Sequence, residues 1–323
     1  MKPKIGIGVG DRNGIGPEIV ARLLSEPRVF AEADIFVVCH PAVLEWGRTV
    51  AGVSEYAGGF TVVERTGFAQ EAMGTGRVDQ MAGAEVLDQL ATLLEGAKER
   101  EIDGIIFAPL NKNAMRLGGL ERGDELDFIL ERSGWSGNTG ELNVLGDLWT
   151  SRVTSHVALH DVAGLITQQR VYEAILLAND TLRAAGKARP RLAVAGLNPH
   201  AGDGGTYGDE ELREIGPAIA RAQREGLDAK GPFPADTVFV AAMRGDFDAV
   251  VTMYHDQGQI AMKLLKFGSG VTVLAGLPVP VATVGHGTAY DIAGKGIARA
   301  DGLMAAFNLC CNMARAKAAS AVR

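Results

Sequence analysis

Short apolar, β-branched runs recur along the chain, and each is bounded by Gly, Pro or Asp. Such runs are typical of strands buried on both faces of a sheet. Between several of them the apolar positions follow a helical period, and strands alternating with helices favour a mostly parallel sheet with helices on both faces. The predicted strands cover residues 4–10, 34–39, 60–64, 104–109, 152–159, 191–196, 248–255 and 270–276, and the predicted helices cover 79–100, 168–185, 209–225 and 302–322.

The length and composition are those of a folded α/β protein. The chain has 323 residues, enough for one large domain or two smaller ones, and 47% of them are hydrophobic. This composition excludes disorder, collagen and coiled coil. The net charge of −7 and the lack of any basic run argue against a nucleic-acid partner or an anionic membrane surface.

The cysteines and the N-terminus indicate a cytoplasmic protein. Cys39, Cys310 and Cys311 are odd in number and show no CxxC spacing, which fits reduced side chains in the core better than a disulfide framework. The first residues carry no apolar targeting segment, and no stretch reaches the ~18 apolar residues of a membrane span.

Three histidines stand in or at the ends of predicted strands: His156, His200 and His255. In open α/β sheets, ligands gather at the carboxyl ends of strands. Three neutral imidazoles converging there would hold Zn²⁺ or a similar divalent cation and leave a position open for substrate. Asp161 and Asp256 each follow a histidine and could orient its ring, although both could equally be helix-cap or turn acids.

Two glycine-rich segments could approach a ligand closely. The first, residues 6–18, admits no G-x-G-x-x-G because Asn13 occupies a required glycine position, so we favour a structural or substrate-side turn over a pyrophosphate cradle. The second, residues 284–298, combines His286, a hydroxyl and Asp291 with several glycines. It could wrap a flat ligand while Asp291 accepts hydrogen bonds from ribose hydroxyls, or it could be a plain connection before the last helix.

Seven motifs are spread over nearly the whole chain: GDRNGIGPEI (10–19), APLNKNAM (108–115), SHVALHDV (155–162), AVAGLNPHAGDGG (193–205), GPFPADTVF (231–239), MYHDQG (253–258) and HGTAYDIAGKG (286–296). With these motifs the chain resembles the 4-hydroxythreonine-4-phosphate dehydrogenase family over nearly its whole length. The last motif is also similar to the adenosine-binding loop of the isopropylmalate and isocitrate dehydrogenases, which share the fold.

The resemblance implies a homodimer of subunits with two α/β/α domains, mostly parallel sheets, and an active site at the dimer interface. Residues 1–125 with 265–323 would form the nucleotide-side domain, and residues 126–264 the metal-binding and dimerisation domain. One divalent metal ion, Zn, Co, Mg or Mn, would be bound by His156, His200 and His255, with ligands contributed across the interface.

The same resemblance implies oxidation of a secondary alcohol in a small hydroxy acid by hydride transfer, followed by decarboxylation of the β-keto acid. Lys263 would contact the substrate, and Lys112 could also pair with the substrate carboxylate. The alternative for either lysine is a solvated surface charge. Asp256 is the third catalytic candidate. The residues expected to bind NAD or NADP are His286, Gly287, Thr288, Asp291 and Gly294.

Four positions depart from the phosphate-binding members of the family. Asp124 and Glu125 stand where those members carry a His-Thr pair, and Thr272 and Val281 replace a substrate-contacting Asn and Arg. Added acids repel a phosphate, and a missing Arg removes charge-assisted bonds to it. We therefore expect a non-phosphorylated substrate such as a carboxylated cis-dihydrodiol, as in the terephthalate dihydrodiol dehydrogenase branch. The alternatives are a dehydrogenase of a 4-phosphorylated hydroxy acid, a metallohydrolase using the same histidines, and an inactive paralogue.

Overall fold

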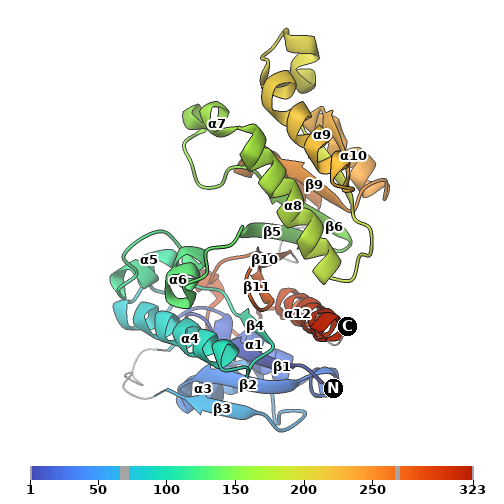
Figure 1. Ribbon diagram of the computed structural model, residues 1–323. Helices are drawn as coiled ribbons and strands as arrows, with labels where there is room; N and C mark the ends of the chain where they lie inside the picture. Colours follow the sequence, from blue (N-terminus) through green and yellow to red (C-terminus); the bar gives the residue numbers. More distant parts are fainter. Residues whose placement is uncertain (1, 66–72, 266–269, 322–323) are drawn as a thin grey trace. The chain divides into compact units, whose positions relative to one another are not determined.

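The computed structural model describes residues 2–65, 73–265 and 270–321, and the chain divides into two compact units (Figure 1). Unit 1 comprises Met1–Ser136 and Leu277–Arg323, and unit 2 comprises Gly137–Gly276. The chain passes from one unit to the other after Ser136 and again after Gly276. The sequence analysis expected these two boundaries earlier, at 125/126 and 264/265. The boundaries lie later because α6 (Glu125–Ser133) packs on α4 (Gln80–Lys98) within unit 1, while β10 (Val271–Ala275) pairs with β5 (Gly140–Leu145) within unit 2.

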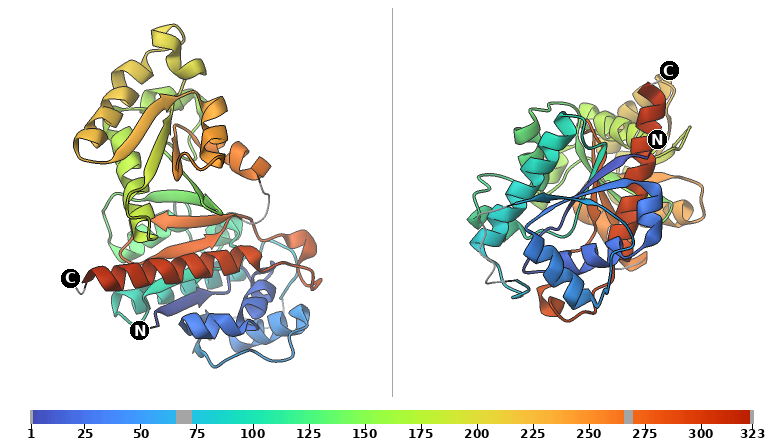
Figure 2. Two further views of the ribbon diagram at one scale, coloured as in Figure 1. Left: turned by 90° about the vertical axis from the view of Figure 1, so that its right-hand side faces the viewer. Right: turned by 90° about the horizontal axis from the view of Figure 1, so that it is seen from below.

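Unit 1 contains a fully parallel sheet with helices on both sides. In spatial order its strands are β3 (Thr61–Glu64), β2 (Asp34–Cys39), β1 (Lys4–Gly8), β4 (Gly104–Phe107) and β11 (Val281–Val284). The central strands are buried on both faces, as their continuous apolar runs predict. Figure 2 shows α4 and α12 (Asp301–Ala321) on opposite sides of these strands. The other helices are α1 (Gly16–Leu24), α2 (Pro27–Glu32), α3 (Pro41–Ala51), α5 (Lys112–Leu117) and the short η3 (Tyr290–Ile292).

Unit 2 contains a mixed sheet. β10, β5 and β6 (Leu148–Arg152) pair antiparallel, and β6, β9 (Ala249–Thr252), β7 (Arg191–Ala195) and β8 (Asp228–Phe233) follow in parallel. The helical segments are α7 (Leu159–Leu165), α8 (Gln168–Ala184), η1 (Pro199–Gly205), η2 (Glu211–Ile215), α9 (Gly216–Arg224), α10 (Ala235–Met243) and α11 (His255–Leu265).

One predicted strand is wrong. Of residues 152–159, only Arg152 belongs to a strand, since β6 ends there and α7 begins at Leu159. Between them His156 has φ 50°, in the left-handed region that no strand residue adopts. Strands β5, β8 and β11 are further differences, because none of the predicted apolar runs covers them.

The expected helices are present, with one irregularity. α4, α8 and α12 follow the predicted periods, while the segment predicted over 209–225 begins with a turn of π-helix, η2, before α9. All three cysteines are free and buried. Within the part of the chain that the structure describes, no helix has the length and apolar character needed to cross a membrane.

Candidate metal and nucleotide sites

Three histidine-bearing loops leave the carboxyl ends of three neighbouring strands in unit 2. β6, β9 and β7 lie side by side and run in parallel. His156 follows β6, His200 follows β7, and His255 follows β9 as the first residue of α11. Because parallel strands share one carboxyl edge, all three loops emerge at the edge where ligands collect in open α/β sheets.

The structure brings two of these histidines together. The ring centroids of His156 and His255 are 5.5 Å apart, with an angle of 42° between the ring planes. Two imidazoles bound to one tetrahedral metal ion have centroids about 5 Å apart, from the usual Zn–N bond length and angle. The centroid distance of this pair is therefore close to that of two histidine ligands of one cation.

Asp256 contacts the ring of the neighbouring histidine. Its Oδ1 lies 2.7 Å from His255 Nδ1. When Nδ1 donates its proton to this carboxylate, the lone pair stays on Nε2, which is the arrangement that prepares a histidine to bind a metal ion. Asp161 Oδ1 lies 3.2 Å from the other ring nitrogen, Nε2, of His160, and that histidine ring is largely exposed.

His200 lies in a different setting. Its ring packs near Tyr207, with a centroid distance of 6.1 Å. Across residues 2–65, 73–265 and 270–321, no three His, Cys, Asp or Glu side chains form a group that could hold a metal ion. One chain thus supplies a two-histidine pair, and the three-histidine site stays a prediction that the resemblance assigns to two chains.

The two candidate lysines occupy different environments. Lys263 is exposed on α11, eight residues after His255, which is about 12 Å along the helix axis. Lys112 is partly exposed and takes part in ion pairs, because its Nζ lies 3.1 Å from Asp124 Oδ2 and 3.4 Å from Glu125 Oε2. Burial disfavours the charged Asp124, but the Lys112 ammonium and backbone hydrogen bonds outweigh it and lower the pKa of that carboxyl.

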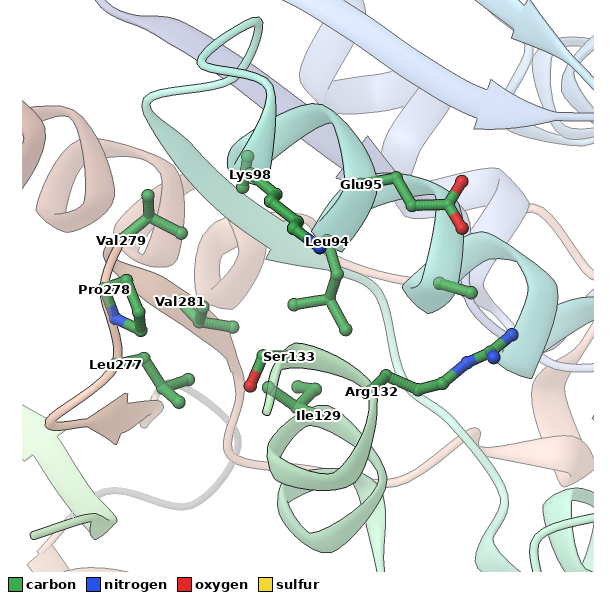
Figure 3. A pocket seen from close by; sticks show the side chains of 12 residues that line it. Leu94, Glu95, Lys98, Ile129, Arg132, Ser133, Leu277, Pro278, Val279 and Val281 are labelled. Atoms are coloured by element: carbon green, nitrogen blue, oxygen red, sulfur yellow. The ribbon is translucent and has the colours of Figure 1, made fainter. Parts of the chain in front are cut away.

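The substitutions that distinguish this chain from phosphate-binding members have local structural roles. Asp124 is the N-cap of α6, where it forms a capping box with Asp127. Thr272 accepts a hydrogen bond from Asn143 at 3.0 Å. Val281 is only 1% exposed, and its side chain lines a pocket of about 290 Å³ in unit 1 together with apolar side chains such as Leu94 and charged ones such as Arg132 (Figure 3).

In the candidate nucleotide loop of unit 1, Asp291 is exposed, while neighbouring residues are held by hydrogen bonds. Asp291 is exposed, and no hydrogen bond or ion pair joins it to another residue in the described parts of the chain. His286 Nδ1 lies 3.0 Å from the Gly287 carbonyl. Ala289 has φ 45° and Gly294 has φ 74°, so the backbone folds tightly around this segment. The exposed carboxylate is available to accept ribose hydroxyls.

The opening glycine-rich segment holds this loop in place. The Ile15 N–H donates to the Thr288 carbonyl at 3.0 Å, and Tyr290 donates its hydroxyl to Asp11 Oδ2 at 2.5 Å. Burial raises the pKa of the Tyr290 phenol well above its usual range, so the hydroxyl keeps its proton. Gly14 is required at this contact, because a Cβ there would lie 2.7 Å from the Thr288 carbonyl oxygen. The segment is thus a supporting turn.

Two residues that the sequence analysis missed hold the histidine loops of unit 2. Glu211 accepts hydrogen bonds from the backbone just before His200, and Gln257 bridges the ends of β9 and β7. Gln257 lies inside the MYHDQG motif, so its place in that motif could have marked it as a candidate site residue. For Glu211 the sequence held no comparable signal.

The fold defines a two-unit α/β protein with mostly parallel strands. An isocitrate dehydrogenase structure from Methylococcus capsulatus aligns with a TM-score of 0.53 at 18% identity, covering 98% of this chain and 88% of that one, which shows the shared fold. The model of the family "Pyridoxal phosphate biosynthetic protein PdxA" matches residues 31–310. The chain belongs to the PdxA family.

Relatives and solved structures agree with this membership. A Pseudomonas aeruginosa protein provisionally named 4-hydroxythreonine-4-phosphate dehydrogenase 2 is 46% identical over 98% of both chains. The 4-hydroxythreonine-4-phosphate dehydrogenase of Geobacter metallireducens is 38% identical over 98% of this chain and 97% of its own. An Oceanobacillus iheyensis protein provisionally named D-threonate 4-phosphate dehydrogenase is 38% identical over 92% of this chain and 93% of its own.

Among solved structures, a 4-hydroxythreonine-4-phosphate dehydrogenase from Klebsiella pneumoniae aligns with a TM-score of 0.83 at 32% identity, covering 97% of this chain and 98% of that one. A terephthalate 1,2-cis-dihydrodiol dehydrogenase from Burkholderia xenovorans aligns with a TM-score of 0.69 at 26% identity over the same shares. The dihydrodiol branch is thus a structural neighbour.

Proposed function

We propose that this chain is a dehydrogenase that uses NAD or NADP and a divalent cation to oxidise the secondary alcohol of a 4-phosphorylated hydroxy acid, after which the β-keto acid loses CO₂. The observation that carries the proposal is the His156–His255 pair, 5.5 Å apart at the ends of adjacent parallel strands, in a member of the PdxA family. A metallohydrolase with the same histidines would leave the HGTAYDIAGKG loop (286–296) without a role.

His156 and His255 would hold the cation, with Asp256 orienting the ring of His255. When bound, a divalent cation supplies Lewis-acid polarisation of the alcohol oxygen and of the carbonyl formed from it. His200 would be the third ligand. Since one chain offers no group of three ligands among its described residues, we infer that the site is completed across a dimer interface.

Exposed apolar side chains on unit 2 support the homodimer. Leu159 on α7 is 72% exposed and Leu264 on α11 is 82% exposed. These two helices begin just after His156 and at His255, so both exposed leucines belong to elements that follow a candidate ligand. We propose that a second copy of the chain covers them. Light scattering coupled to gel filtration would give twice the 34.0 kDa chain mass.

The substrate assignment follows the relatives that are named for 4-phosphorylated hydroxy acids. Those named for 4-phosphorylated hydroxy acids are 38–46% identical, and the dihydrodiol dehydrogenase is 26% identical. This reverses the order of preference drawn from the sequence. Asp124 and Glu125 also repel a substrate phosphate less than two free acids would, because both lie within ion-pair distance of Lys112.

One observation favours a second candidate, a carboxylated cis-dihydrodiol without a phosphate. Val281 is buried and its side chain carries no charge, so it cannot replace the substrate-contacting Arg that the resemblance places at this position. If the substrate carries a phosphate, other cations of the chain must bind it; Lys263 is exposed and available. Turnover rates on matched phosphorylated and non-phosphorylated hydroxy acids decide between the two candidates.

The nucleotide would bind the loop of residues 286–296. Gly287, Thr288 and Gly294 would let the backbone approach the adenosine, and Asp291 would accept the ribose hydroxyls. A carboxylate at the ribose favours a free 2′-hydroxyl over a 2′-phosphate, which supports NAD over NADP. Thermal stabilisation by each nucleotide tests this step, and stabilisation by neither would contradict it.

A further inference from the structure

The turn that carries His200 is strained. His200, Ala201 and Asp203 have φ of 54°, 53° and 45°, and two glycines complete a run of five left-handed residues. Non-glycine residues rarely adopt this conformation, because their Cβ then lies too close to the following carbonyl oxygen. Such a turn persists only where its surroundings hold it, and strain of this kind clusters at functional sites.

A buried carboxylate stabilises the turn that carries His200. Glu211 is buried, and only 4% of the residue is exposed. Its Oε1 accepts the backbone N–H groups of Leu197 and Asn198, both at 2.8 Å, and its Oε2 accepts the Asn198 side-chain amide at 2.9 Å. Hydrogen bonds to an ionised carboxylate are roughly twice as strong as neutral ones. Glu211 therefore fixes the two residues at the entrance of the turn.

The turn packs directly against this carboxylate. A Cβ at Gly202 would lie 2.7 Å from Glu211 Oε2, and a Cβ at Gly196 would lie 2.9 Å from the Cα of Ala201. Neither glycine leaves space for a side chain. The left-handed run and Glu211 thus form one closely packed unit.

Gln257 joins the same turn to the segment of His255. Its Oε1 accepts the Met253 backbone N–H at 2.7 Å, and its Nε2 donates to the Gly196 carbonyl at 2.9 Å. Met253 follows β9 and Gly196 follows β7. One side-chain amide therefore ties together the ends of the two strands that precede His255 and His200.

We propose that Glu211 and Gln257 are positioning residues for the metal-binding histidines. Glu211 fixes the backbone that presents His200, and Gln257 fixes the spacing between the His200 and His255 loops. This inference depends on the proposed function, because it takes these histidines to be metal ligands. Groups that orient metal ligands through hydrogen bonds typically contribute 10–100-fold to metal affinity.

The first test titrates the purified protein with Co²⁺, whose visible absorption reports both affinity and ligand geometry. Glu211→Gln preserves size but sets an amide NH₂ against the amide of Asn198. We expect Co²⁺ affinity to fall about 10–100-fold while the far-UV circular dichroism stays unchanged. The matched control is Glu214→Gln on the same η2 segment, whose carboxylate accepts the Gln168 N–H at 2.7 Å instead. It should bind Co²⁺ as the parent protein does.

The second test is Gln257→Glu. It keeps the acceptor for Met253 but places an oxygen opposite the Gly196 carbonyl, so we expect weaker binding and a changed Co²⁺ spectrum. This variant decides the question should Glu211→Gln fail to fold. Parent-like affinity and spectra in the folded variants would overturn the positioning role. Absence of Co²⁺ binding by the parent protein would instead overturn the proposed metal site.

Discussion

Tyr290 donates its hydroxyl to Asp11 Oδ2 at 2.5 Å, and this bond joins two motifs that lie at opposite ends of the sequence. Asp11 is fully buried, and burial raises the pKa of its carboxyl although the Tyr290 hydrogen bond acts to lower it. The opening glycine-rich turn therefore supports the nucleotide loop.

We predict that Tyr290→Phe leaves Asp11 short of a hydrogen bond and lowers the free energy of unfolding by about 1–2 kcal/mol. The loop of Asp291 should also bind NAD or NADP several-fold more weakly, as measured by calorimetric titration. Tyr56→Phe is the matched control, since it removes a hydroxyl that donates to the Leu44 carbonyl at 3.2 Å in the same unit. Equal nucleotide affinity in both variants would show that the Tyr290 bond does not support the loop.

The histidine pair makes a prediction about metal content. His156→Ala and His255→Ala should each lose the bound divalent cation and the dehydrogenase activity, with circular dichroism preserved. His40→Ala should keep both, because His40 caps α3, where its Nδ1 accepts the Ala42 N–H at 3.1 Å. Metal content is measured by plasma emission spectroscopy after dialysis. A full complement of metal in His255→Ala would refute the assignment.

Asp256 should affect the cation through His255. Asp256→Asn retains a group near Nδ1 but removes the negative charge that favours the Nδ1–H tautomer, so we expect metal affinity to fall about tenfold. Competition with a chromophoric chelator measures this. Asp161→Asn is the control, because the Asp161 carboxylate also lies beside a histidine ring, 3.2 Å from Nε2 of the exposed His160. Equal losses in the two variants would contradict the role of Asp256.

Much of the fold follows from the sequence. The apolar runs of β1, β2 and β4 are buried on both faces as predicted, and α4 follows its helical period from an Asp79 cap. β8 escaped prediction because its sequence, DAKGPF, contains a lysine, a glycine and a proline and has no apolar run. The strand predicted over 152–159 is wrong. Residues 153–159 have the composition of a strand, but composition does not determine how the backbone packs, and the structure forms a loop there with His156 at φ 50°.

The sites divide in the same way. The three histidines could be chosen from their place after strands, and the loop of Asp291 from its residue types. The contacts that hold them could not, because Glu211 acts on backbone groups 13 and 14 residues away, and Gln257 on a carbonyl 61 residues away. Such pairings exist only in the folded chain. Likewise, only the structure reveals that Lys112 pairs with Asp124.

Acid stability should depend on Asp248 in unit 2. Hydrogen bonds from Arg191, opposed by burial and assisted by Lys187, lower the pKa of Asp248 to about 2. Because the folded pKa lies below the ordinary value, this carboxylate stabilises the fold above about pH 4, and the contribution is lost as the pH falls toward 2.

Asp248→Asn should therefore lower the free energy of unfolding by about 1 kcal/mol at pH 6, a value reduced by the exposure of its partners, and the deficit should shrink toward pH 3. Urea unfolding at several pH values measures it. Asp228→Asn, whose carboxylate lies 3.9 Å from Lys230 Nζ, should show a smaller deficit. A deficit independent of pH would contradict the assignment.

The most direct test of the account is the initial rate of NAD(P)H formation by the metal-loaded protein. The panel contains 4-phosphohydroxythreonine, D-threonate 4-phosphate, their dephosphorylated forms and a carboxylated cis-dihydrodiol. We predict turnover of a 4-phosphorylated hydroxy acid that chelator abolishes and added divalent metal restores. Turnover of the dihydrodiol alone, or of none of these compounds with either nucleotide, would contradict the proposed function.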